Sequence, residues 1–115
     1  MMVEMMATLG EGMELAGRAG LPQDQLVQVL QEGAMANPMF GLKGPKIIAD
    51  DHAAHFPLKH ARKDLLFGLE LAEELGQGQT DMGNAAKAVI ARAVEGDGQG
   101  RLEDDFSALT KGFQN

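Results

Sequence analysis

The stretch FPLKHARKDLLFGLELAEELG, residues 56–76, decides the fold class that we predict for this sequence. Pro57 suits the first position of a helix, and the residues after it repeat at helical spacing as far as Leu75. The apolar positions in the middle are Leu65, Leu66, Phe67, Leu69 and Leu71. Because these positions surround the helix almost completely, we expect a helix from about Pro57 to Leu75 that is the central, most buried one.

The same stretch carries a cluster of basic side chains at the start of this helix. Lys59, Arg62 and Lys63 are three of the ten Lys and Arg in the chain. The N-terminus of a helix carries partial positive charge and favours acidic side chains, so these cations are poorly placed. Spacing alone favours a solvated outer face, since charge runs are usually exposed. The alternative is a site where ammonium and helix N–H groups bind a phosphate or carboxylate.

Helical periodicity continues on both sides of this stretch, and no alternating Val- or Ile-rich run predicts a strand. We expect helices over residues 1–19, 22–33, 81–95 and 103–111, and short helical pieces and turns over 39–55. The helix over 81–95 is expected to bury Ala85, Ala88, Val89 and Ala93. The sequence therefore predicts one all-α domain over residues 1–115, a bundle of five or six helices.

Charge and composition restrict the partners of the chain. The 115 residues carry 17 acidic and 10 basic side chains, a net charge of −7. Such a charge argues against non-specific binding to nucleic acid or to anionic membranes. The absence of Cys excludes disulfides and thiolate metal sites, and no apolar run approaches the length of a membrane span. We expect a soluble protein, cytoplasmic or organellar, without nucleic-acid or membrane partners.

Few side chains suggest catalysis by the chain itself. Ser107 is the only serine and lies in a helix of ordinary appearance, so we predict no hydrolase triad. His52 and His55 have no standard metal-ligand spacing, so we predict solvated histidines and no metal. Asp104 and Asp105 are expected to lie on a solvated face.

Several blocks resemble one enzyme family in its own order. Residues 56–76 resemble the F-x-L-x-x-x-x-K-D-L-x-L-A-x-x-x-A helix of the β-hydroxyacid dehydrogenases, which include 3-hydroxyisobutyrate dehydrogenase. MMATLGEGMELAGRAGL (5–21) resembles the helix after the catalytic lysine of that family. GAMANPMFGLKGPKII (33–48) is most similar to the plant glyoxylate/succinic semialdehyde reductases. The segment 80–109 resembles the closing helices, with Asp81 in place of the usual proline.

The resemblance implies an all-α bundle like the C-terminal domain of 6-phosphogluconate dehydrogenase-like proteins. In such enzymes this domain follows a Rossmann domain that binds NAD or NADP. Residues 1–19 resemble the C-terminal part of the interdomain helix. The family's catalytic lysine would lie upstream of Met1, so we expect a fragment that lacks the proton donor and is inactive alone.

The resemblance also implies residue roles. Lys63 would contact the cofactor, while Asp64 would order the active site and Phe56 would border the substrate pocket. The implied reaction is NAD(P)-dependent reduction of a small aldehyde, such as glyoxylate or succinic semialdehyde, by hydride transfer without a metal. The chain would form a homo-oligomer through its helical domain. The alternative is a non-catalytic helical interaction module that self-associates or binds a full-length homologue.

Overall fold

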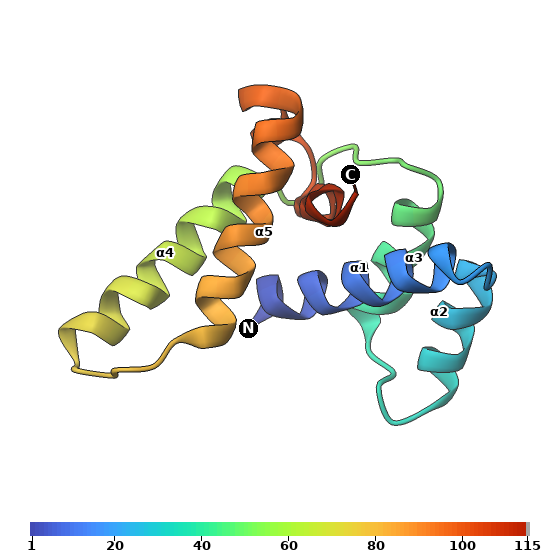
Figure 1. Ribbon diagram of the computed structural model, residues 1–115, viewed down its shortest axis with the longest axis horizontal. Helices are drawn as coiled ribbons and strands as arrows, with labels where there is room; N and C mark the ends of the chain where they lie inside the picture. The colour runs from blue at the N-terminus through green and yellow to red at the C-terminus, as the bar shows by residue number, and fades with distance from the viewer. Residues whose placement is uncertain (115) are drawn as a thin grey trace.

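The computed structural model describes residues 1–114, with the side chains of residues 1–96 and 101–114. The elements are α1 (Met2–Arg18), α2 (Gln23–Glu32), α3 (Pro38–Ile48), α4 (Leu58–Glu74), α5 (Asp81–Asp97) and the 3₁₀-helices η1 (Gly98–Glu103) and η2 (Phe106–Phe113). Extended pairing within the described residues is limited to one isolated antiparallel bridge between Pro57 and Asp105. The predicted all-α class is confirmed (Figure 1).

Helices α1 and η2 form the centre of the bundle. One side of α1 is buried along its length, and Met6 and Met13 are 0% and 1% exposed. Helix η2 crosses α1 closely at Gly10, where an added Cβ would lie 2.5 Å from Thr110 Cγ2. Because Gly10 has no side chain, α1 and η2 can approach each other closely at this position. The first five positions of η2, from Phe106 to Thr110, are all buried.

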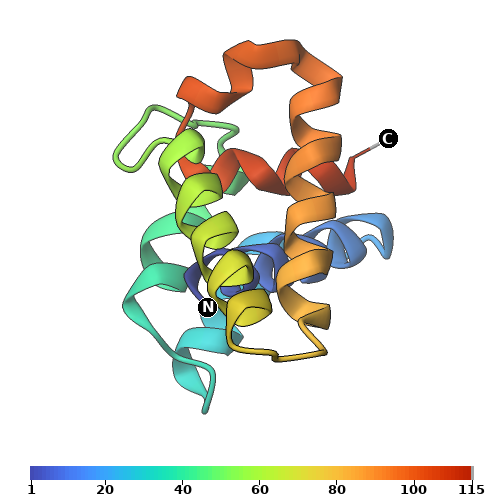
Figure 2. The same ribbon diagram turned by 90° about the vertical axis from the view of Figure 1, so that its left-hand side faces the viewer.

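Helix α4 is an outer helix, so our expectation that it is the most buried one was wrong. Only Leu58, Ala61 and Leu65 of α4 are buried. Leu66, Phe67 and Leu71 are 37%, 60% and 53% exposed. In Figures 1 and 2, α4 lies at the edge of the molecule, beside α5. The apolar residues around α4 thus form two faces, one that packs on the core and one that is exposed, and they do not indicate complete burial.

The closing segment also differs in detail from the prediction. On α5 the buried positions include Ala86, Val89 and Ile90, whereas Ala85 and Ala88, expected inside, are exposed. The expected last α-helix is the 3₁₀-helix η2, which starts after Asp105 and buries both polar and apolar residues.

Helix α3 is continuous, where we expected short pieces and turns. The side chain of Asn37 accepts a hydrogen bond from the N–H of Phe40 at 3.0 Å and caps the helix. Pro38 follows in the first turn, where its missing N–H does no harm. Pro45 lies inside the helix without ending it. No helix in the described part of the chain is long and apolar enough to cross a membrane.

Candidate functional site

The segment that leads into α4 runs beside the start of η2. The N–H of Asp105 donates to the carbonyl of His52, and the N–H of Phe106 donates to that of Phe56, both at 2.8 Å. The N–H of Leu58 donates to the carbonyl of Asp104, also at 2.8 Å. These bonds fix the backbone of the predicted substrate residue Phe56 and the first turn of α4.

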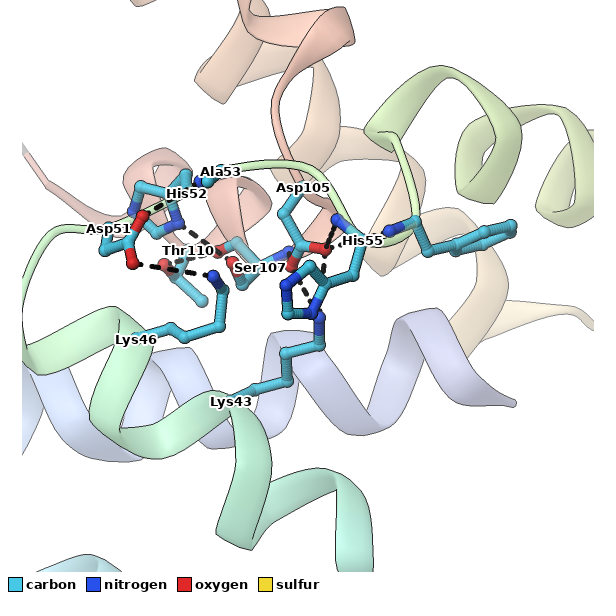
Figure 3. Close-up of polar contacts among 10 residues, drawn as sticks. Lys43, Lys46, Asp51, His52, Ala53, His55, Asp105, Ser107 and Thr110 are labelled. Carbon is cyan, nitrogen blue, oxygen red and sulfur yellow. Dashed lines mark hydrogen bonds and ion pairs between the residues drawn. The ribbon is translucent and has the colours of Figure 1, made fainter.

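The carboxylate of Asp105 is the centre of this arrangement (Figure 3). Lys43 Nζ, from α3, lies 2.9 Å from each of its oxygens. The N–H groups of His55 and Phe56 donate to Oδ1 at 3.1 and 3.0 Å, and the N–H of Ser107 donates to Oδ2 at 3.1 Å. Asp105 is 0% exposed and Lys43 4%. Our prediction of a solvated Asp105 was therefore wrong, because one buried carboxylate joins three segments.

The hydrogen bonds to Asp105 also decide its protonation state. Burial alone raises the pKa of this carboxyl group, since a charge is costly away from water. The hydrogen bonds from Lys43 and from the N–H groups of Phe56 and Ser107 outweigh burial and hold the pKa well below its usual range. Asp105 is therefore ionised at neutral pH.

The ring of Phe56 is half-buried between two aromatic neighbours. It meets the ring of Phe106 edge-on, with centroids 5.8 Å apart and an interplanar angle of 75°. The ring of His60 lies 6.2 Å away on α4. Lys43 Nζ lies 5.1 Å from the centroid of Phe106, so the buried ion pair and the aromatic group are in contact. Both the backbone and the ring of Phe56 are thus held in place.

Lys63 and Asp64 lie together on α4, and both are exposed. Lys63 Nζ is 3.5 Å from Asp64 Oδ1, and the two side chains are 52% and 58% exposed. Lys63 Nζ also lies 6.0 Å from the ring centroid of Phe67. The structure therefore brings Lys63 and Asp64 together, whereas the ring contacts of Phe56 are with His60 and Phe106.

Asp64 borders a cavity of about 610 Å³ between α4, the start of α5 and the start of α1. Its lining includes Met1, Met2, Gly68 and Met82. The surface of this cavity is mainly apolar. On the other side of α4, Lys59 Nζ pairs with Glu103 at 2.8 Å, and both side chains are largely exposed.

His52 is not a solvated histidine, in contrast to our prediction. Its side chain is 6% exposed, and its Nδ1 lies 2.9 Å from Ser107 Oγ. Its Nε2 lies 3.3 Å from Asp50 Oδ1, and Asp50 also pairs with Lys111. Burial lowers the pKa of His52 and the charge of Lys111 lowers it further, although Asp50 raises it in part. His52 is therefore neutral at pH 7.

The order Asp50, His52, Ser107 is that of a hydrolase relay, but the geometry does not allow that chemistry. Ser107 is 0% exposed, so its hydroxyl oxygen cannot reach a substrate carbonyl group. Ser107 instead donates its N–H to Asp105 and accepts a bond from the Thr110 hydroxyl at its carbonyl. Among the residues whose side chains are described, no group of three or more His, Asp or Glu could hold a metal ion.

Comparison with known proteins identifies the family. A family model described as the NAD-binding region of NADP-dependent 3-hydroxyisobutyrate dehydrogenase matches residues 1–112. The chain belongs to this dehydrogenase family. The resemblance that the sequence indicated is confirmed.

Proteins similar to this chain include both named enzymes and named nuclear factors. Glyoxylate/succinic semialdehyde reductase 2, chloroplastic, of Arabidopsis thaliana is 37% identical over 98% of the chain and 30% of its own length. Cytokine-like nuclear factor N-PAC of Mus musculus is 31% identical over 94% of the chain and 19% of its own length. The crystal structure of 3-hydroxyisobutyrate dehydrogenase from Salmonella typhimurium has a TM-score of 0.83 and 25% identity, over 95% of the chain and 37% of that protein. The chain thus spans well under half of each relative.

Neither Lys43 nor Asp105 was predicted from the sequence to belong to the site. A signal was present for each. Lys43 is a charge among the apolar residues of MFGLKGPKII, and Asp105 precedes an apolar run, as a helix cap does. Asp105 does cap η2, through its bond from Ser107. Neither signal indicated that the two residues meet, because 62 positions separate them.

Proposed function

We propose that this chain forms the helical, substrate-side domain of an NAD(P)-dependent 3-hydroxyacid dehydrogenase. The reaction would be reduction of a small aldehyde, such as glyoxylate or succinic semialdehyde, by hydride transfer. The observation that carries this proposal is the similarity to an Arabidopsis reductase of that name along nearly the whole chain.

The exposure of Lys63 supports a contact with the cofactor. Its ammonium group has one ion pair in the described structure, the 3.5 Å contact with the adjacent Asp64. A group held this weakly is available to an anionic or carbonyl oxygen of a bound nucleotide. A bound nicotinamide cofactor would supply the hydride, and Lys63 would fix its position relative to the aldehyde.

Phe56 and Asp64 are the proposed substrate-side residues. Phe56 is preorganised by the bonds of its backbone to Asp105 and Phe106, which suits a residue that shapes a pocket. Asp64 borders the 610 Å³ cavity and can orient polar groups there. The resemblance gives no residue of this chain the role of the family's proton-donating lysine, so we expect the 115-residue polypeptide alone not to reduce glyoxylate.

A chimera tests this proposal directly. In the Arabidopsis reductase, the matching segment is replaced by this chain, and NADPH-dependent reduction of glyoxylate and succinic semialdehyde is measured. The proposal predicts turnover of at least one of the two aldehydes. A chimera that unfolds cooperatively and binds NADPH, yet reduces neither aldehyde, contradicts it.

A second candidate function is an interaction module that self-associates or binds a full-length homologue. The exposed apolar residues of α4 favour it, as does similarity to proteins that are named nuclear factors rather than enzymes. Light scattering over a range of concentrations tests this candidate. A strict monomer without affinity for a full-length homologue would exclude it.

A further inference from the structure

His60 lies between the proposed substrate residue Phe56 and the proposed cofactor contact Lys63. Its ring centroid is 6.2 Å from that of Phe56, and the two ring planes meet at 31°. His60 precedes Lys63 by three residues and Asp64 by four, so its side chain neighbours both of them on α4. These four residues therefore form one continuous surface, in which His60 is the member without a role so far.

The backbone of His60 belongs to a firmly held first turn of α4. Its N–H donates to the carbonyl of Pro57 at 3.0 Å. The N–H of Leu58 donates to the carbonyl of Asp104 at 2.8 Å. Leu58 and Ala61 pack this turn on the core, and each is 0% exposed. A side chain on such a rigid element keeps its position relative to a bound ligand.

The ring nitrogens of His60 are available to a ligand. The residue is exposed, and within the described part of the chain neither ring nitrogen has a hydrogen-bond partner. His52 differs, because its ring is buried and lies 2.9 Å from the Ser107 hydroxyl oxygen. An imidazole donates at least one N–H in either protonation state, so His60 offers a hydrogen-bond donor to the ligand.

The surroundings of His60 favour a negatively charged acceptor. The first turn of α4 contains no acidic residue. Asp64 lies one turn later, and its carboxylate is paired with Lys63 at 3.5 Å. The N–H groups of Leu58, His60 and Ala61 donate within the chain. Side chains, and not the N–H groups of the helix N-terminus, would therefore bind an anion here.

We propose that His60 binds the carboxylate of the aldehyde substrate and thereby favours succinic semialdehyde over glyoxylate. This inference rests on the proposed function, in which Lys63 fixes the cofactor beside the aldehyde group. His60 lies three residues before Lys63, which is about 4.5 Å along the helix axis toward Phe56. The carboxylate that His60 binds must therefore be separated from the reacting carbon.

The two aldehydes differ in this separation. Two methylene groups lie between the carboxylate and the aldehyde carbon of succinic semialdehyde, whereas the two carbons of glyoxylate are bonded directly. The longer aldehyde can reach His60 while its carbonyl group remains beside the cofactor. Its methylene groups can then pack on the ring of Phe56, which the contact with Phe106 holds in place.

The test uses the chimera with the Arabidopsis reductase and compares two four-carbon aldehydes. Succinic semialdehyde carries the carboxylate, and butanal carries a methyl group at that end. His60→Phe keeps an aromatic ring beside Phe56 and removes the N–H donor from an exposed position, so the fold should tolerate it. It should lower kcat/KM for succinic semialdehyde about tenfold to a hundredfold. The kcat/KM for butanal and the KM for NADPH should not change.

Two further variants make the result specific to the N–H donor of His60. His60→Gln retains a side-chain N–H donor and should recover most of the lost kcat/KM for succinic semialdehyde. His55→Phe makes the same replacement at another exposed histidine, in the segment before α4. It is the matched control and should leave kcat/KM for both aldehydes unchanged.

The possible outcomes separate this inference from the proposed function. If His60→Phe lowers kcat/KM equally for both four-carbon aldehydes, or for neither, His60 does not bind the carboxylate and the inference is wrong. A chimera that reduces glyoxylate but not succinic semialdehyde also overturns the inference, and it leaves the proposed function intact. A chimera that binds NADPH and reduces neither of these two contradicts the proposed function, and the inference fails with it.

Discussion

Asp105 and Lys43 form a buried ion pair, with the ammonium nitrogen 2.9 Å from both carboxylate oxygens. The pair joins α3 to the start of η2, and the same carboxylate holds the segment before α4 through the N–H groups of His55 and Phe56. The position of the proposed substrate residue Phe56 therefore depends on a residue 49 positions away in the chain.

The two members of this ion pair should contribute unequally to stability. Asp105→Asn leaves Lys43 buried and unpaired, so we expect a loss of about 3–5 kcal/mol in the free energy of unfolding. Lys43→Met leaves Asp105 with its backbone hydrogen bonds, so the loss should be about 1–3 kcal/mol. Urea unfolding followed by circular dichroism measures both. Asp104→Asn, at a partly exposed pair with Arg101, is the control and should cost about 0–1 kcal/mol. Equal losses for Asp105→Asn and Lys43→Met would contradict the unequal roles.

Acid should remove the contribution of Asp105. Its pKa in the folded chain lies below that of the unfolded chain, so the unfolded state takes up the proton first. The contribution is complete well above the unfolded value of about 3.9 and decreases as the pH falls below it. We expect the stability difference between the original chain and Asp105→Asn to shrink between pH 7 and about pH 3. A difference that stays constant over this range would show that folding does not lower the pKa of Asp105.

His52 should act in a separate pH range. Burial, together with Lys111, lowers its pKa in the folded chain despite Asp50, and Arg101 and Asp104 also face it with opposite effects. The unfolded histidine binds a proton near pH 6.5, whereas the folded one resists it, so stability decreases below about pH 6.5. His52→Gln should reduce this decrease between pH 7 and about pH 5.5, and His55→Gln, at an exposed position, should not. If stability decreases equally with pH in the original chain, His52→Gln and His55→Gln, His52 is not the source of the pH dependence.

Two glycines with opposite surroundings test the packing of η2. A Cβ at Gly112 would clash with the carbonyl oxygen of Val89 on α5, and this backbone atom cannot move aside. Gly112→Ala should therefore lower stability by about 1–3 kcal/mol. Gly12 of α1 has no atom within 4 Å of such a Cβ, so Gly12→Ala should raise stability by about 0.5–1 kcal/mol. Thermal unfolding of both variants checks the pair. A stable Gly112→Ala would mean that η2 and α5 are farther apart.

Local patterns in the sequence predicted the helices better than their burial. Pro57 marked the start of α4 correctly, because its effect on the backbone is local. The predicted burial of α4 was wrong, because periodicity cannot distinguish an apolar face that packs on the core from one that is exposed to solvent. Phe67, at 60% exposure, belongs to the outer face.

Contacts between distant residues were not predictable from the sequence alone. Asp105 and His52 had the local appearance of solvated residues, and both are buried by partners more than 50 positions away. Proline likewise misled the prediction at α3, since Pro45 lies inside the continuous helix, directly after the buried residues Lys43 and Gly44. The predicted roles of Lys63, Asp64 and Phe56 came from family resemblance, and the structure adds their exposure and contacts.

The last prediction concerns Lys63 in the active chimera with the Arabidopsis reductase. Lys63→Ala removes an exposed ammonium group whose contacts are a 3.5 Å ion pair with Asp64 and the ring of Phe67, so the fold should be unaffected. Loss of a charged hydrogen bond to the cofactor should raise the KM for NADPH about tenfold to a hundredfold. Lys87→Ala, which removes an exposed lysine from α5 instead of α4, is the matched control and should leave the KM for NADPH unchanged. An unchanged KM for NADPH in the Lys63 variant would exclude the cofactor contact.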